Sequence, residues 1–144
     1  MKVFGLMAVI LLTITLGSCS SHKTSKESDG TMKTSSGLQM QDILVGHGVE
    51  AEKGDEVFVH YVGTLDDGTQ FDSSKERNKP FNFVLGDSRI IKGWNEGLVG
   101  MKVGGKRRLI IPPHLAYGNS PMGKIPANST LHFDVELVDV RKGK

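Results

Sequence analysis

The aromatic residues of this chain are spread singly over segments that have the composition of strands and turns. Eight of the nine lie between positions 58 and 133: Phe58, Tyr61, Phe71, Phe81, Phe83, Trp94, Tyr117 and Phe133. A helix that packs a core repeats its apolar residues every three or four positions, whereas rings from distant segments can converge on one concave apolar pocket. An ordinary β-rich core is the alternative that this pattern alone leaves open.

The length and charge of the chain exclude several classes of protein. Its 144 residues allow one domain of roughly 100 residues and a tail. The net charge is only +2 and shows no basic stripe, which argues against nucleic-acid binding. The five histidines have no pair at helical ligand spacing and there is one cysteine, so we expect no metal site and no cofactor. Eighteen glycines favour strands joined by tight turns.

The first residues have the pattern of an export signal. Lys2 precedes an apolar run from 3 to 16, which is short for a bilayer span and typical of a signal core. Leu16-Gly17-Ser18-Cys19 then resembles the bacterial lipobox, in which the cysteine is lipidated after cleavage before it. We therefore expect a lipoprotein signal over 1–18 and a lipid anchor on Cys19. A plain secretory signal with an incidental thiol is the alternative.

Residues 19–37 are expected to form the lipidated cysteine and a flexible linker. The segment is rich in Ser, Thr and Lys, and Met32 is its single large apolar residue beyond the cysteine. Such a composition buries too little surface to offset the entropy of ordering. The globular domain is expected over 38–144.

The domain has the signals of an α+β fold. Strands are predicted at 38–42, 56–62, 81–85, 106–111 and 130–140, because these runs alternate or are rich in β-branched and aromatic residues. One short helix is predicted after Ser88 as its cap, with Gly100 at its end. A short helix with one apolar stripe needs a sheet to cover, so we expect an antiparallel sheet wrapped over it.

Six segments together resemble the motif blocks of FKBP-type peptidyl-prolyl isomerases, in the family's order and nearly throughout at its spacing. They are His60-Tyr61-Val62-Gly63, Phe71-Asp72-Ser73-Ser74, Asn78-Lys79-Pro80-Phe81-Asn82-Phe83, Ile90-Ile91-Lys92-Gly93-Trp94, Ala116-Tyr117-Gly118 and Leu131-His132-Phe133-Asp134-Val135-Glu136-Leu137. The resemblance spans the domain from about Gly54 onward. It implies a five- or six-stranded antiparallel sheet curled around one short helix, with a pocket between them that receives a proline.

The same resemblance implies roles for individual residues. Catalytic roles fall to Asp72, Trp94 and Tyr117, with Trp94 as the pocket floor, Asp72 in a polar cluster with Tyr61 and Arg77, and the Tyr117 hydroxyl and the Ile91 N–H on substrate carbonyls. The substrate-binding residues are Tyr61, Phe71, Phe81, Ile90, Ile91, Ile125 and Phe133. Phe58 and Phe83 are expected to pack or to face away from the ligand. Asp72 as a simple turn cap before Ser73 is the alternative interpretation.

The expected activity is peptidyl-prolyl cis-trans isomerisation without a covalent intermediate. The implied partners are proline-containing exported or envelope proteins, the membrane through lipid on Cys19, and macrolide inhibitors; we expect a monomer. Because Ser20 follows the cysteine, the outer membrane facing the periplasm is the expected location. A non-catalytic proline-binding module at the membrane and a structural envelope lipoprotein remain as other hypotheses.

Overall fold

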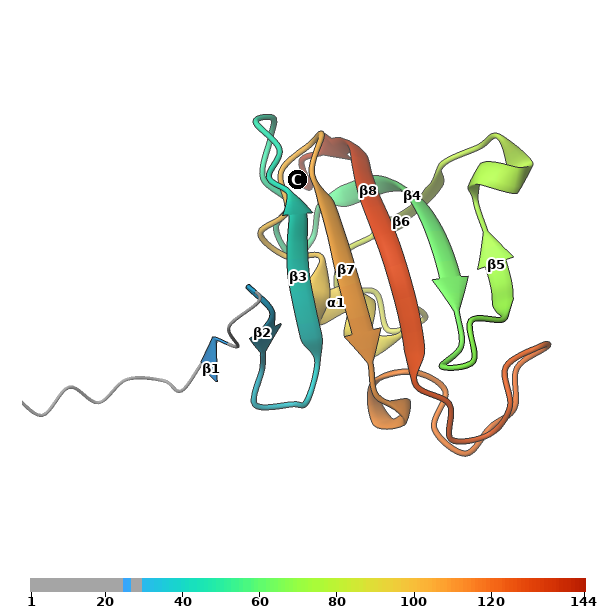
Figure 1. Ribbon diagram of the computed structural model, residues 1–144. Helices are drawn as coiled ribbons and strands as arrows, with labels where there is room; N and C mark the ends of the chain where they lie inside the picture. Colours follow the sequence, from blue (N-terminus) through green and yellow to red (C-terminus); the bar gives the residue numbers. More distant parts are fainter. Residues whose placement is uncertain (1–24, 27–29) are drawn as a thin grey trace, which may run out of the picture.

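The computed structural model describes residues 25–26 and 30–144 (Figure 1). The predicted signal over 1–18 and the lipidation site at Cys19 lie outside the described residues. Within these residues, no helix is long and apolar enough to cross a membrane.

One antiparallel sheet dominates the described part of the chain, and the single short α-helix of this part lies behind the sheet (Figure 1). The elements are β1 Ser25–Lys26, β2 Met32–Lys33, β3 Gln39–Leu44, β4 Glu56–Thr64, β5 Gln70–Ser73, the 3₁₀ turn η1 Lys75–Arg77, β6 Phe81–Val84, α1 Lys92–Gly97, β7 Lys106–Ile111, the 3₁₀ turn η2 Pro113–Leu115 and β8 Leu131–Arg141. The strand order is β1-β2-β3-β7-β8-β4-β5, and β6 pairs with β4 on the same side as β5. This arrangement confirms the predicted fold class, with β1 and β2 as two-residue additions at one edge.

The core lies between the concave face of the sheet and α1. Burial alternates along β4, where Val57, Val59 and Tyr61 point inward. The same alternation along β8 buries Leu131, Phe133, Val135 and Leu137, as their spacing in the sequence predicts. β4 and β8 pair at nine positions, with one bulge between Phe58 and Val59. The side chains on both sides of the bulge stay buried, so the inward side chains form one continuous apolar layer.

The helix differs from the prediction at its start. It begins after Ile91, whose backbone is extended, and no side chain caps it, so the predicted cap at Ser88 is wrong. The side chain of Asn95 ties the preceding turn instead, accepting from Gly86 N at 2.8 Å and donating to Asp87 O at 2.8 Å. Gly100, with φ of +86°, follows the helical segment as expected.

Two glycines in the helix explain how closely it lies on the sheet. A Cβ on Gly93 would stand 2.5 Å from the side chain of Ile111, and one on Gly97 would stand 2.8 Å from that of Leu109. Glycine is a weak helix former. Here its missing side chain allows α1 to pack directly against β7.

The expected linker needs a correction over its last residues. Met32 and Lys33 form β2 and pair with Met40 and Gln39 of β3, so the fold begins before residue 38. The turn after β2 is held by Ser36, which donates from Oγ to Glu96 Oε1 at 2.6 Å and whose carbonyl lies 2.6 Å from His114 Nε2. Ser36, which the composition assigned to a linker, therefore binds α1 through its side chain and η2 through its backbone carbonyl.

Candidate functional site

A cavity of about 270 Å³ opens between the concave sheet face and α1. Its walls come from β4, β5, β6, β8, α1 and two connecting loops. The lining residues are Tyr61, Phe71, Asp72, Phe81, Arg89, Ile90, Ile91, Trp94, Tyr117 and Phe133. The structure thus brings together all the predicted cavity residues except Ile125. Six of the eight scattered aromatic residues thus converge on one concave site.

Trp94 lies at the centre of a cluster of aromatic rings formed with Tyr61, Phe81, Phe83 and Phe133. Its ring centroid is 5.0 Å from that of Tyr61, 5.2 Å from that of Phe133 and 6.0 Å from that of Phe81, all in edge-on geometry. The residue is 5% exposed, as a pocket floor would be. Edge-to-face pairs at these separations are favourable beyond their buried area, so the rings fix one another.

The indole N–H of Trp94 has no hydrogen-bond partner. It is the one buried side-chain nitrogen or oxygen among the described residues that lacks one. A buried unpaired donor costs free energy. The orientation of Trp94 is therefore set by ring packing against its neighbours, because no hydrogen bond selects it.

A closed set of three polar groups stands at one edge of the cavity. The Tyr61 hydroxyl donates to Asp72 Oδ2, Arg77 Nη1 lies 2.7 Å from Asp72 Oδ1, and Arg77 Nη2 donates to the Tyr61 hydroxyl at 3.0 Å. Asp72 also accepts from the backbone N–H of Ser73 at 2.8 Å. The predicted cluster is present, and the turn-capping contact of the alternative interpretation exists beside it.

This cluster controls the ionisation of its members. Burial acts to raise the pKa of Asp72, but hydrogen bonds from Tyr61 and Arg77 outweigh it and leave the pKa below its ordinary value. Burial, followed by the bond to Asp72, raises the pKa of Tyr61 to about 12. At neutral pH the cavity edge therefore carries a carboxylate, a neutral phenol and a guanidinium.

Two hydrogen-bond donors face no protein acceptor in the described part of the chain. The Tyr117 hydroxyl makes no bond there, and this residue is 36% exposed at the cavity. Burial, followed by the charge of Asp72, raises its pKa, so the hydroxyl keeps its proton. The Ile91 N–H is also free, as expected at the start of a helix. Both donors are available to a ligand carbonyl.

Ile125 is the predicted site residue that the structure does not bring to the cavity. It is buried at 5% exposure in the core, because the loop doubles back through paired bonds between Met122 and Ile125 at 2.8 and 2.9 Å. Gly123, with φ of +55°, allows this tight turn. The apolar character of Ile125 was correctly recognised, but its contact is with the core.

Arg89 is the lining residue that the sequence reasoning missed. Its guanidinium binds Asp87 with Nη2 2.6 Å from Oδ2, and its side chain is 87% exposed at the rim. Its position in the sequence directly before Ile90 and Ile91, two predicted cavity residues, could have indicated that Arg89 also lines the cavity. Phe83 and Phe58 lie outside the cavity: Phe83 is buried against Trp94, and Phe58 lies on the opposite face under Arg141.

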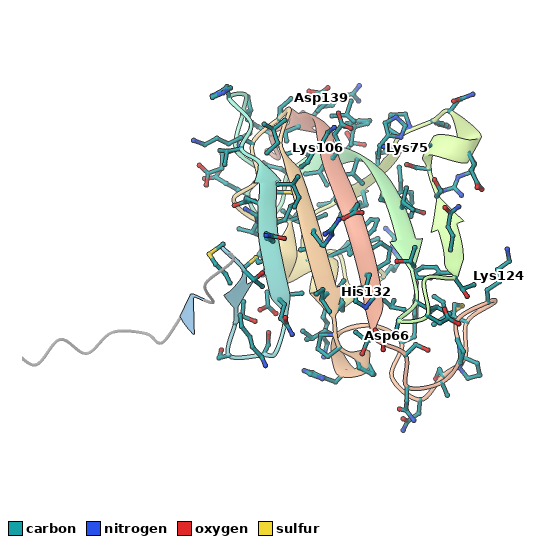
Figure 2. All side chains as sticks on the ribbon, in the orientation of Figure 1. Asp66, Lys75, Lys106, Lys124, His132 and Asp139 are labelled. Atoms are coloured by element: carbon teal, nitrogen blue, oxygen red, sulfur yellow. The ribbon has the colours of Figure 1, made fainter. Side chains whose placement is uncertain are left out.

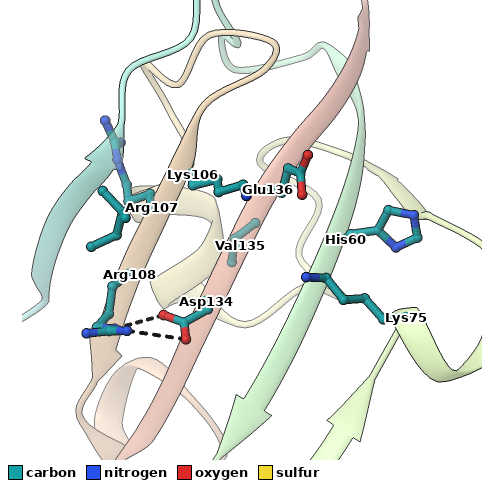
Figure 3. Close-up of a pocket in the computed structure, with 9 residues that line it drawn as sticks. His60, Lys75, Lys106, Arg107, Arg108, Asp134, Val135 and Glu136 are labelled. Carbon is teal, nitrogen blue, oxygen red and sulfur yellow. Dashed lines mark hydrogen bonds and ion pairs between the residues drawn. The ribbon is translucent and has the colours of Figure 1, made fainter.

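The convex face of the sheet holds a different hollow of about 220 Å³ (Figure 3). Lys106, Glu136, His60 and Lys75 surround it, and Arg108 pairs with Asp134 at 2.8 Å. Figure 2 places Lys75, Lys106, His132 and Asp66 on this same face, which carries both acidic and basic side chains. The hollow has no Phe, Tyr or Trp in its lining and mixes charges, so the concave cavity is the better candidate for an apolar ligand. No cluster of possible metal ligands occurs among the residues described.

Comparisons with known proteins agree with this geometry. A family model described as FKBP-type peptidyl-prolyl cis-trans isomerase matches residues 48–138. The chain is 53% identical over 107 residues to FK506-binding protein 1A of Neurospora crassa, which covers 73% of this chain and 89% of that protein. It is 52% identical over 106 residues to the peptidyl-prolyl cis-trans isomerase Fkbp12 of Drosophila melanogaster, covering 72% and 98%. The crystal structure of FkpA from Escherichia coli matches with a TM-score of 0.75 and 47% identity, covering 83% of this chain and 55% of that one.

Proposed function

The chain belongs to the FKBP-type peptidyl-prolyl cis-trans isomerase family and is an isomerase of this kind, and on this premise we propose how its cavity accelerates rotation about X–Pro bonds. Resonance holds the amide planar and gives rotation a barrier of about 18–20 kcal/mol. No covalent bond has to break, so the protein needs only to bind the twisted amide more tightly than the planar one.

The apolar walls supply the first part of this preference. A planar amide is more polar than a twisted one, and water stabilises the planar form more strongly. When the proline ring lies on Trp94, between Phe71, Phe81 and Phe133, that solvation is lost. The planar ground state then rises in free energy relative to the twisted transition state.

The polar groups supply the second part. The free Tyr117 hydroxyl and Ile91 N–H donate to substrate carbonyls and hold the chain on each side of the rotating bond. Asp72 places a fixed negative charge at the cavity edge, where the carbonyl dipole turns during rotation. These groups act by position and charge alone, so neither a nucleophile nor a general base is required.

The observation that carries this mechanism is the convergence of the aromatic walls, the free donors and Asp72 on one cavity. A prolyl isomerisation assay on the domain starting at Ser20 tests it. We expect turnover well above the uncatalysed rate and competition by a proline-containing peptide. Binding of the peptide without turnover would instead indicate a non-catalytic proline-binding module.

We also propose that the protein is a lipoprotein that acts on exported proteins in the cell envelope. The support is the sequence from Lys2 to Cys19, with its apolar run and its lipobox-like end. We expect labelled lipid to enter the wild type and not Cys19→Ser, and fractionation to place the wild type in the outer membrane. Equal labelling of both proteins would contradict lipidation at this residue.

Macrolide binding is the third proposal for this site. Relatives named FK506-binding proteins share about half of their sequence with this chain over the domain. The apolar cavity and the two free donors suit a ligand that presents a ring and carbonyl oxygens. Competition between FK506 and a prolyl substrate measures it, and the expected result is loss of turnover with one inhibitor molecule per chain.

A further inference from the structure

A second cavity adjoins the proline cavity on the side of β6. Its volume is about 390 Å³, and it shares Phe81, Arg89 and Ile90 with the first one. The two therefore meet at a common wall. A chain that leaves the proline cavity on this side has a hollow to enter.

The strand beside this second cavity has a free backbone edge. Among the strands that the structure describes, β6 pairs with β4 alone. Just after β6, Leu85 directs both its N–H and its C=O toward the β4 side, donating to Asp55 O and accepting from Gly54 N at 2.8 Å each. Because these groups alternate along a strand, those of Asn82 and Val84 point the other way.

Most of these outward groups have no partner in the described structure. The Val84 carbonyl accepts from Asp87 N at 3.1 Å, but the Asn82 N–H, the Asn82 C=O and the Val84 N–H have no backbone partner there. Unpaired groups on an edge strand form a template for another extended chain.

The side chains around this edge favour backbone recognition. The charged side chains here already have partners: Glu56 Oε1 accepts from Asn82 Nδ2 at 2.8 Å, and Arg89 Nη2 donates to Asp87 Oδ2 at 2.6 Å. Phe81 and Val84 are 38% and 46% exposed and offer apolar contact. A chain docked here is held through its main chain, with little selection among its side chains.

We propose that a flank of the substrate adds to β6 as a further strand while its proline occupies the first cavity. The proposal rests on the isomerase function of that cavity. The preferred substrates are then unfolded chains that extend for several residues on the β6 side of the proline. Short prolyl peptides are poorer substrates.

The first test compares peptide lengths. A four-residue prolyl peptide is compared with peptides extended by four residues before or after the same central sequence. Two or three added backbone hydrogen bonds predict kcat/KM about tenfold higher for one of the extended peptides. Equal kcat/KM for all three would overturn the proposal, while turnover of the short peptide would leave the isomerase function standing.

The second test removes the edge donor. Asn82→Pro deletes the N–H of residue 82, and proline is tolerated at a strand edge. Asn82→Ala keeps the N–H and loses only the bond to Glu56, so it is the matched control. We expect Asn82→Pro to lose the advantage of the extended peptide and to keep the turnover of the short one, with Asn82→Ala unchanged in both. An advantage that persists in Asn82→Pro would contradict strand addition.

A third measurement needs neither a variant nor turnover. Amide hydrogen exchange of the wild type is followed with a saturating extended peptide and with a saturating short one. The amides of Asn82 and Val84 should be protected by the extended peptide alone. Absence of that protection would overturn the proposal even if Asn82→Pro failed to fold.

Discussion

The guanidinium of Arg77 holds the carboxylate of Asp72 at 2.7 Å, from a 3₁₀ turn that follows the strand carrying the carboxylate. The Tyr61 hydroxyl closes the set by binding both groups. Three elements thus fix one negative charge at the rim of an apolar cavity, and its position is set before substrate arrives.

Asp72→Asn should lower kcat/KM about tenfold and leave the fold intact. The amide keeps the shape of the side chain but loses the charge, and charged hydrogen bonds are worth more than neutral ones. The Asp72 side chain is 40% exposed, so solvent screens the effect and stability should change little. Steady-state isomerisation kinetics and thermal melts measure both. Unchanged kinetics would remove Asp72 from the mechanism.

Trp94→Leu should reduce both turnover and stability. The substitution removes a ring that contacts four others and is 5% exposed. By analogy with large-to-small core substitutions, unfolding should become easier by about 2–3 kcal/mol. Denaturant melts give the stability, and kcat/KM below the unfolding transition gives the activity. Phe58→Leu, on the opposite face, is the control and should keep full turnover.

Tyr117→Phe should separate binding from folding. The Tyr117 hydroxyl has no protein partner in the described residues, so its loss leaves no unpaired group behind. We expect an unchanged melting temperature and a rise in KM or a fall in kcat/KM of about fivefold, the value of one neutral hydrogen bond. A variant that is less stable would show that the hydroxyl has a structural role instead.

Acid should loosen the C-terminal segment through Asp55. Lys142 Nζ lies 2.7 Å from Oδ2 of this buried residue, and Gly143 N donates to Oδ1 at 3.0 Å. The hydrogen bond from Lys142, followed by that from Gly143, lowers the pKa of Asp55 to about 2. A lowered carboxyl pKa stabilises the fold above the unfolded value near 3.9, and this contribution is lost as pH falls toward 2.

Asp55→Asn should therefore lower the melting temperature at pH 7 by a few degrees. The difference from the wild type should shrink as the pH is reduced from about 4 to about 2. Glu52→Gln is the control, because Glu52 is the exposed partner of the same lysine and should matter little. A difference that stays constant with pH would rule out ionisation of Asp55 as its cause.

The sequence predicted the sheet and most of the cavity because those features depend on local patterns. Alternation along residues 130–140 assigns Phe133 to the inner face whatever the partner strand is. The motif blocks then placed the aromatic residues and Asp72 around one cavity, which the structure reproduces.

The parts that could not be predicted depend on contacts between distant segments. Ser36 lies in a segment with the composition of a linker. Its hydrogen bonds with Glu96 and His114, which are distant in the sequence, hold it in place. Ile125 leaves the cavity because a four-residue turn folds it back into the core. The turn before the helix is held by the side chain of Asn95, which belongs to the helix itself. A capping pattern considers only residues at the helix start, so it does not predict these hydrogen bonds.

The close packing of α1 on β7, which Gly93 allows, also affects the depth of the proline cavity. Any side chain at this position meets Ile111, so the helix could accommodate one only by moving away from the sheet. Trp94 is the next residue and would be carried outward with it. The depth of the proline cavity is therefore set by a hydrogen atom on the far side of its floor, at a residue that does not line the cavity.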